Sequence, residues 1–207
     1  MTTLSDVWIF GQNDCEPPFT WQNATNGGVG PAARASAGFA NDQGYRQGSF
    51  VLFGGIDSTG QTLSDTWIFD PSVGPSWTTG AYYFVGCGYC YVSYTMQGQW
   101  GASSLRGPVS GREAPSLAFE GGSTGGSLLL FGGYNGATSY SDLWTWTCTS
   151  GNPCTTWVWT LSTPATSPGA RGWGMMGPYS AGSAAIVLFG GYDPFSGTQY
   201  ADTWAYP

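Results

Sequence analysis

The sequence predicts an all-β protein that is built from repeats of a four-stranded unit. Glycine contributes 34 of the 207 residues, aromatic residues make up 16% of the chain and charged residues only 8%, which is typical of short strands joined by tight turns. The density of Trp, Tyr, Phe, Val and Leu separates this chain from disordered glycine-rich sequences. The third observation is a motif that recurs along the chain.

The motif consists of an apolar run, Phe-Gly-Gly, a polar gap and Asp-x-Trp. It appears as "SFVLFGGIDSTGQTLSDTWIF" from Ser49, "SLLLFGGYNGATSYSDLWTW" from Ser127 and "AIVLFGGYDPFSGTQYADTWAY" from Ala185. A fourth Asp-x-Trp stands in "LSDVWIF" near the start, without a Phe-Gly-Gly before it, so the chain is expected to begin inside a repeat. One arginine precedes each Phe-Gly-Gly by 19, 19 and 18 residues: Arg34, Arg112 and Arg171.

Each repeat is expected to contain four strands. The first follows the arginine, the second is the β-branched run into Phe-Gly-Gly, and the third begins at Asp-x-Trp. The fourth carries a second tryptophan, 13 residues after the first at Trp21 and Trp157 and 10 residues after it at Trp77. The chain then holds two, four, four and three strands in successive repeats, thirteen in all.

The motif residues have structural explanations. A glycine pair at a strand end suits a backbone with positive φ or a close approach to a neighbouring ring. The aspartate can accept hydrogen bonds from nearby backbone amides and close the loop. Because one unit cannot bury its own tryptophans, successive units must stack.

Three Phe-Gly-Gly and four Asp-x-Trp elements resemble the kelch repeat family. The resemblance implies that each repeat is a four-stranded blade of a β-propeller. The single domain would then divide into a partial blade at 1–29 and blades at about 30–107, 108–166 and 167–207. Three blades make a small ring, and the first and last pieces both supply a third strand, so simple closure is not expected. Either the chain belongs to a longer propeller or another chain completes its blades, and the unpaired edges favour self-association.

Residues 79–100 form an insertion that the other repeats lack. Its centre, "YYFVGCGYCYVSY", predicts a hairpin with Gly88-Tyr89 at the tip of a type II′ turn and with Cys87 facing Cys90. The hairpin can cover an adjoining blade or present a contact surface, since exposed aromatic residues suit protein interfaces and stacking on sugars. The surface would comprise Tyr82, Tyr83, Phe84, Tyr89, Tyr91, Tyr94 and Trp100.

Five cysteines predict disulfides. Cys148 and Cys154 bracket a loop between two strands, and a bridge there would staple a hairpin. Cys87 and Cys90 form the second expected pair, which leaves Cys15 over unless it pairs with one of them. A zinc site would require distant cysteines to converge because the chain has no histidine, so neither a metal nor another cofactor is expected.

The absence of histidine and lysine restricts catalysis. It excludes a Ser-His-Asp or Cys-His arrangement, a lysine Schiff base, and the histidine-ligated copper of the oxidases in the kelch family. The repeat arginines Arg34, Arg112 and Arg171 could contact an anion or a sugar, but pairing with backbone carbonyls or repeat aspartates is the commoner use. Glu113 and Glu120 make no glycosidase unless they converge. We therefore expect no catalytic residues.

The net charge of -7 argues against nucleic acid, and the apolar runs are too short to span a membrane. No signal peptide is seen, but the cysteines and the sequon at Asn23 indicate an extracellular or cell-surface glycoprotein. Few charges titrate in acid, which suggests an acid-stable protein. The sequence therefore predicts a noncatalytic structural or interaction module, such as a self-associating subunit of a cell-surface filament or an adhesive domain. A carbohydrate-binding or carbohydrate-active propeller is the alternative.

Overall fold

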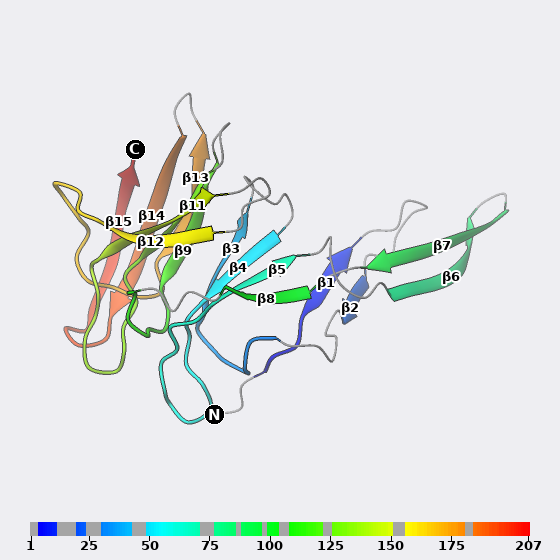
Figure 1. The fold of residues 1–207 in the computed structure, drawn as a ribbon, viewed down its shortest axis with the longest axis horizontal. Helices are drawn as coiled ribbons and strands as arrows, with labels where there is room; N and C mark the ends of the chain where they lie inside the picture. Colours follow the sequence, from blue (N-terminus) through cyan, green and yellow to red (C-terminus); the bar gives the residue numbers. More distant parts are fainter. Residues whose placement is uncertain are drawn as a thin grey trace.

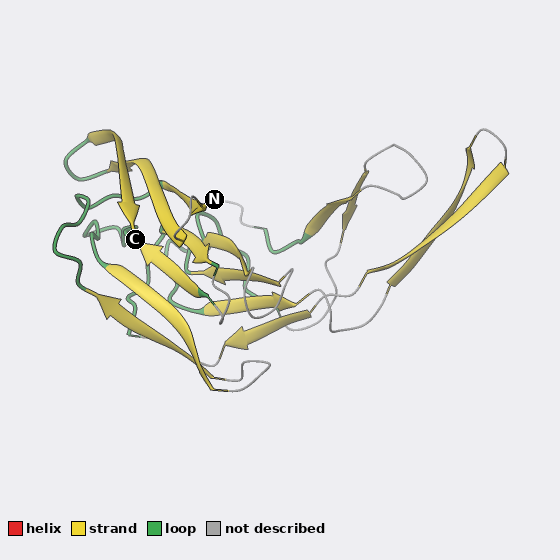
Figure 2. Cartoon of the chain, turned by 90° about the horizontal axis from the view of Figure 1, so that it is seen from above, coloured by secondary structure: helices red, strands yellow, loops and turns green. Residues whose placement is uncertain are grey.

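A computed structural model describes residues 4–11, 20–23, 30–42, 49–70, 77–85, 88–96, 99–103, 108–121, 126–150, 156–180 and 184–207. These residues contain fifteen strands and no helix, which confirms the all-β prediction (Figure 1). Figure 2 shows the same strands, joined by loops, from a second direction. Every pair of neighbouring strands is antiparallel. The described sheets do not close into a ring.

Three sheets hold the Phe-Gly-Gly repeats, and their strands are arranged in sequence order. The first four-stranded sheet contains β3 (Gly38–Asp42), β4 (Ser49–Phe53), β5 (Thr66–Asp70) and β8 (Gln99–Ser103). The second four-stranded sheet contains β9 (Ser116–Glu120), β10 (Ser127–Phe131), β11 (Leu143–Ser150) and β12 (Thr156–Ser162). The three-stranded sheet contains β13 (Met175–Ser180), β14 (Ala184–Asp193) and β15 (Thr198–Tyr206).

Two hairpins complete the described fold. β1 (Trp8–Gly11) pairs with β2 (Thr20–Asn23), as expected for the third and fourth strands of the first repeat. β6 (Trp77–Val85) pairs with β7 (Gly88–Met96), and this hairpin is inserted between β5 and β8. Its two strands explain why fifteen strands are found where thirteen were predicted.

The insertion also overturns two local predictions. Trp77 does not lie in the fourth strand of its repeat but begins β6, and β8 pairs with β5 so that Trp100 lies opposite Phe69. The hairpin turn does not lie at Gly88-Tyr89, because the register pairs Val85 with Gly88. Cys90 lies opposite Tyr83 rather than Cys87. Cys87 itself is outside the described residues, so a bond between the two cysteines stays a prediction.

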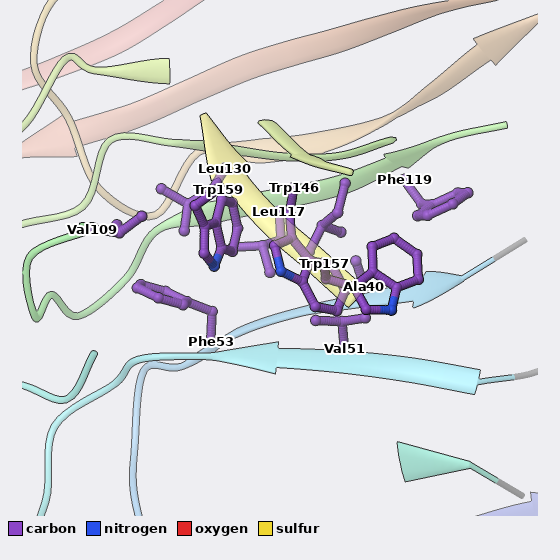
Figure 3. Close-up of a cluster of buried hydrophobic side chains, with 11 residues drawn as sticks. Ala40, Val51, Phe53, Val109, Leu117, Phe119, Leu130, Trp146, Trp157 and Trp159 are labelled. Atoms are coloured by element: carbon purple, nitrogen blue, oxygen red, sulfur yellow. The ribbon is translucent and has the colours of Figure 1, made fainter. Parts of the chain in front are cut away.

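The three repeat sheets stack face to face, and their contacts form the core. The second four-stranded sheet is central, so Leu128, Leu129 and Leu130 of β10 are buried on both of its faces. Against the first sheet it packs Trp146, Trp157 and Trp159, which lie over Val51 and Phe53 in Figure 3. The rings of Trp146 and Trp157 stack with centroids 4.2 Å apart. Its other face packs against the three-stranded sheet through Leu129, Phe131, Ile186 and Leu188.

The glycine pair shows why repeats dock at this motif. Gly132 and Gly133 have φ values of 67° and 91°, and the glycine pairs of the other two repeats also have positive φ, as predicted. A Cβ atom on Gly132 would lie 2.2 Å from the carbonyl oxygen of Arg171 in the next repeat. The close neighbour is therefore the backbone of the next repeat and not an aromatic ring.

A line of hydrogen bonds runs from sheet to sheet through equivalent residues. The N–H of Ala114 donates to the carbonyl of Ser36 at 2.7 Å, and the N–H of Trp173 donates to the carbonyl of Ala114 at 3.0 Å. All three residues stand two positions after a repeat arginine, and their φ values are 52°, 53° and 54°. Each repeat thus presents the same backbone donor and acceptor to its two neighbours.

Candidate interaction site

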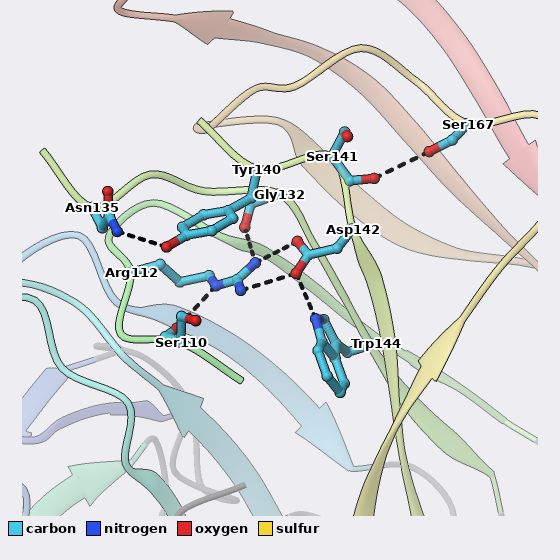
Figure 4. A network of polar contacts seen from close by, with 9 residues as sticks. All are labelled: Ser110, Arg112, Gly132, Asn135, Tyr140, Ser141, Asp142, Trp144 and Ser167. Atoms are coloured by element: carbon cyan, nitrogen blue, oxygen red, sulfur yellow. Dashed lines mark hydrogen bonds and ion pairs between the residues drawn. The ribbon is translucent and has the colours of Figure 1, made fainter. Parts of the chain in front are cut away.

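The repeat arginine is the centre of a polar network in each of the three repeat sheets, and Figure 4 shows the network around Arg112. Nη1 and Nη2 of Arg112 donate to the two carboxylate oxygens of Asp142 at 2.6 and 3.0 Å. Nη1 also donates to the carbonyl of Gly132 at 3.0 Å, and Nε to that of Ser110 at 3.1 Å. The guanidinium carbon lies 3.9 Å from the ring centroid of Tyr140.

The same network occurs in the other two sheets. Arg34 pairs with Asp65 and Arg171 with Asp202, again with both carboxylate oxygens engaged. These arginine side chains are buried, and each donates from Nε, Nη1 and Nη2 to acceptors of its own repeat. The structure therefore does not support the anion or sugar contacts considered for Arg34, Arg112 and Arg171. Pairing with repeat aspartates, the commoner use, is what the structure shows.

The repeat aspartate accepts from a tryptophan as well. The indole Nε1 of Trp67 donates to Asp65 at 2.6 Å, and Trp144 donates to Asp142 at the same distance. The first and last Asp-x-Trp elements make the same bond. The expectation that this carboxylate closes the loop through backbone amides is therefore corrected, because its main donors are a guanidinium and an indole. The ion pair links the segment before the first strand of a sheet to the segment before its third strand.

These bonds lower the pKa of two repeat aspartates, Asp65 and Asp202. Hydrogen bonds from Arg171 and Trp204 lower the pKa of Asp202 to about 2. Burial raises the pKa of Asp65, but the hydrogen bonds from Arg34 and Trp67 outweigh it and hold the pKa below its ordinary 3.8. Hydrogen bonds from Ser139 and Ser196 lower the pKa of Asp193 to about 2.

Stability against acid follows from these shifts. A carboxylate with a depressed folded pKa contributes stability above its unfolded pKa of 3.8 and loses that contribution as the pH falls towards 2. Near-ultraviolet circular dichroism should therefore stay constant from pH 7 to about pH 4 and decline only below that. Asp202→Asn removes one of these titrating carboxylates, so the circular dichroism signal of the variant should fall less steeply below pH 4. A transition centred above pH 4 would contradict the assignment.

Glu113, one of the two carboxylates considered for a glycosidase, lies against Tyr134. Glu113 is buried, and the raised pKa of Tyr134, about 12, is caused by burial and then by the negative charge of Glu113. Within the ranges given above, no three acidic or cysteine side chains gather as a metal site would require. The same ranges hold no helix that is long and apolar enough to cross a membrane.

The outer face of the three-stranded sheet exposes several large apolar side chains. Phe53, Phe131 and Phe189 occupy the same motif position, yet 1%, 3% and 50% of their respective surfaces are exposed. Phe189 lies opposite Met175, which is 75% exposed, and Tyr179 of β13 is also exposed. In the other two sheets, the next sheet covers this position. The face therefore has the form of an inter-sheet contact that lacks its second half.

The far end of the stack exposes apolar residues too. Phe39 of β3 is exposed, and its ring stacks on that of Phe50 with centroids 5.2 Å apart. Leu4 and Trp8, next to and within β1, are exposed as well. Both ends of the row of sheets thus present apolar surface, in contrast to its buried middle.

A pocket opens between the second four-stranded sheet and the three-stranded sheet. The space inside the pocket and at its mouth is about 480 Å³, open solvent included, and its lining is mostly apolar. Leu129, Phe131 and Leu143 form one wall, and the opposite wall includes Leu188 and Tyr206. The loop at residues 164–168 borders the opening.

Several predicted site residues fall outside what the structure describes. Backbone alone is described for the aromatic hairpin and β8, so the contact surface formed by their side chains stays a prediction. The same holds for glycosylation of Asn23, which ends β2. Cys148 is half of a disulfide, but its predicted partner Cys154 lies outside the described residues, as does Cys15.

The exposed face was missed by sequence reasoning. Phe189 carries the same Phe-Gly-Gly signature as its buried counterparts, so no local signal distinguishes it. What exposes it is the absence of a further described sheet beyond β13, β14 and β15.

Comparison with known proteins finds several solved structures that match the chain, that of YjhT among them. No protein-family model and no curated protein matches the chain. The solved structure of YjhT superposes with a TM-score of 0.49 at 17% sequence identity, over 88% of this chain and 45% of that one. The chain therefore spans less than half the length of that protein.

Proposed function

We propose that this chain is a noncatalytic, kelch-type propeller module of an extracellular or cell-surface assembly, and that it acts by binding copies of itself. The repeat sheets would be its blades, with the Arg-Asp-Trp network as their common frame. The disulfide at Cys148 and the sequon at Asn23 are in keeping with an exported protein.

The exposed outer face of the three-stranded sheet carries the proposal. Its central residue, Phe189, belongs to a position that is buried against a neighbouring sheet in both preceding repeats. A sheet face with this pattern, exposed beside an unpaired edge strand, favours association. Since the surface at the Phe39 end differs from it, the contact would be heterologous and would build a ring or a filament.

Self-association can be measured on the whole chain by light scattering after size exclusion, over a range of concentrations. We expect the apparent mass to rise with concentration, and Phe189→Ser to weaken the association about tenfold through loss of apolar contact. Phe195→Ser is the matched control, because Phe195 is equally exposed but lies in the loop between β14 and β15. A strict monomer at every concentration would rule the proposal out.

The carbohydrate-binding alternative would use the repeat arginines and the tyrosines. The arginines are buried against aspartates, so the tyrosines are the contacts that this alternative keeps. An adhesive role towards other surface proteins is still compatible with the same exposed face and would appear as binding without self-association.

A further inference from the structure

The outer edge of β15 ends the three-stranded sheet. Within the described residues, β15 pairs with β14 alone, whereas the corresponding strand β11 pairs with both β10 and β12. The Asp-x-Trp motif aligns Asp142 with Asp202 and Trp146 with Tyr206. Since Trp146 lies opposite Trp159 in the register of the second sheet, a strand added to β15 would place its equivalent residue opposite Tyr206.

The pocket beside β15 lies where that residue would go. Trp159 packs edge-on against Phe53 of the first sheet, with ring centroids 5.5 Å apart, and its indole N–H donates to Thr66 Oγ1 at 3.3 Å. One repeat later, the motif positions of Phe53 and Thr66 are held by Phe131 and Leu143, and both of these line the pocket. The pocket thus has the position and the apolar wall of an indole site.

The chain contains a strand with a tryptophan at the required register. In the β1–β2 hairpin, Trp21 lies opposite Phe10, and Phe10 stands four residues after Asp6 just as Trp146 stands four after Asp142. Trp21 of β2 is therefore the counterpart of Trp159. Its partner β1 carries the same Asp-x-Trp motif as β15.

We propose that β15 of one copy replaces β1 beside β2 of a second copy, and that Trp21 of the second copy fills the pocket. This inference rests on the proposed self-association and adds the edge of β15 and the pocket to the exposed outer face as contacts between copies. One antiparallel ladder is exchanged for another, so little backbone pairing is lost. Burial of an indole then favours the exchange, because a two-stranded hairpin alone is marginally stable.

The backbone contacts between repeats fit the same exchange. The N–H of Arg34 donates to the carbonyl of Leu4, and the N–H of Arg171 donates to that of Tyr140 at the same motif position. Leu4, Tyr140 and Tyr200 each stand two residues before the aspartate of an Asp-x-Trp motif. After the exchange, the carbonyl of Tyr200 could therefore accept the hydrogen bond that Arg34 of the second copy now donates to Leu4. The sheet-to-sheet line would also continue, since within the described residues it ends at the carbonyl of Trp173 and the N–H of Ser36.

Point variants of the full chain test which strands exchange. Trp21→Ala should weaken self-association about tenfold, whereas Gln22→Ala should not, because successive strand residues alternate between faces.

Ile9→Pro and Phe10→Pro test whether β2 must leave β1 before it can pair with β15. At one of these two adjacent positions the proline must remove a β1–β2 hydrogen bond, so it should release β2 and strengthen association several-fold. Proline variants that stay folded by circular dichroism yet associate more weakly than wild type would overturn the exchange.

A synthetic peptide provides a readout that does not depend on folding of a variant. A peptide with the sequence of residues 18–25, "PFTWQNAT", should bind the full chain and inhibit its association, while the same peptide with alanine for tryptophan should not. If the chain associates but neither the peptide nor Trp21→Ala has an effect, the strand exchange is wrong and the proposed self-association stands. If the wild type and the proline variants are all monomeric, both are wrong.

Discussion

Arg112→Leu is expected to lower the free energy of unfolding by about 3 kcal/mol, because it removes one partner of a buried ion pair. The side chain is 1% exposed and donates to Asp142 and to two backbone carbonyls. With leucine at this position, the Trp144 indole would be the remaining described donor to the Asp142 carboxylate. The carbonyls of Ser110 and Gly132 would each lose the hydrogen bond from Arg112. Urea unfolding followed by tryptophan fluorescence measures the change.

Two further variants separate the charge of Arg112 from its geometry. Arg112→Lys keeps the positive charge but cannot bind both carboxylate oxygens and a carbonyl through one planar group, so it should cost about 1–2 kcal/mol. A double-mutant cycle with Asp142→Asn should give a coupling of about 1–3 kcal/mol. Additive effects in that cycle would show that the pair contributes nothing beyond its two separate side chains.

Gly132→Ala is expected to destabilise the protein by about 3 kcal/mol or more. Two costs combine at this position. The φ of 67° is unfavourable for a residue with a Cβ atom, by about 1–2 kcal/mol. The added Cβ would also lie 2.2 Å from the carbonyl oxygen of Arg171, so the next repeat must move away at a further cost of about 1–3 kcal/mol.

Gly136→Ala is the matched control for Gly132→Ala. Gly136 has a similar φ of 83°, but no atom lies within 4 Å of its Cβ position. It should therefore show the conformational cost alone, and thermal unfolding of the two variants measures the difference. Equal losses of stability would mean that close docking of the next repeat on Gly132 does not matter.

The repeat frame could be predicted because its determinants are local in sequence or recur at fixed spacing. The Phe-Gly-Gly glycines adopt positive φ wherever they occur, and each repeat arginine meets the aspartate of its own repeat. The spacing argument failed at the fourth strands. Trp77 begins an inserted hairpin, so the strand beside β5 comes later, at β8.

Register corrects the alignment of the second tryptophans as well. Spacing equates Trp21 with Trp157, since each follows its Asp-x-Trp tryptophan by 13 residues. The pairing of Phe10 with Trp21 and of Trp146 with Trp159 equates Trp21 with Trp159 instead. Loop length varies between repeats while cross-strand pairing does not, so only the sheet shows which tryptophan enters an inter-sheet contact.

The sequence by itself determined the strand class, the repeat, the glycine conformations and the residue types from which the polar network is built. Only the tertiary structure decided which copies of the motif are covered. Phe131 and Phe189 both stand in the sequence Leu-Phe-Gly-Gly-Tyr, and one is buried while the other is exposed. The physical reason is that burial depends on the sheet that packs from outside, and a residue's own neighbours in sequence do not encode whether that sheet is present.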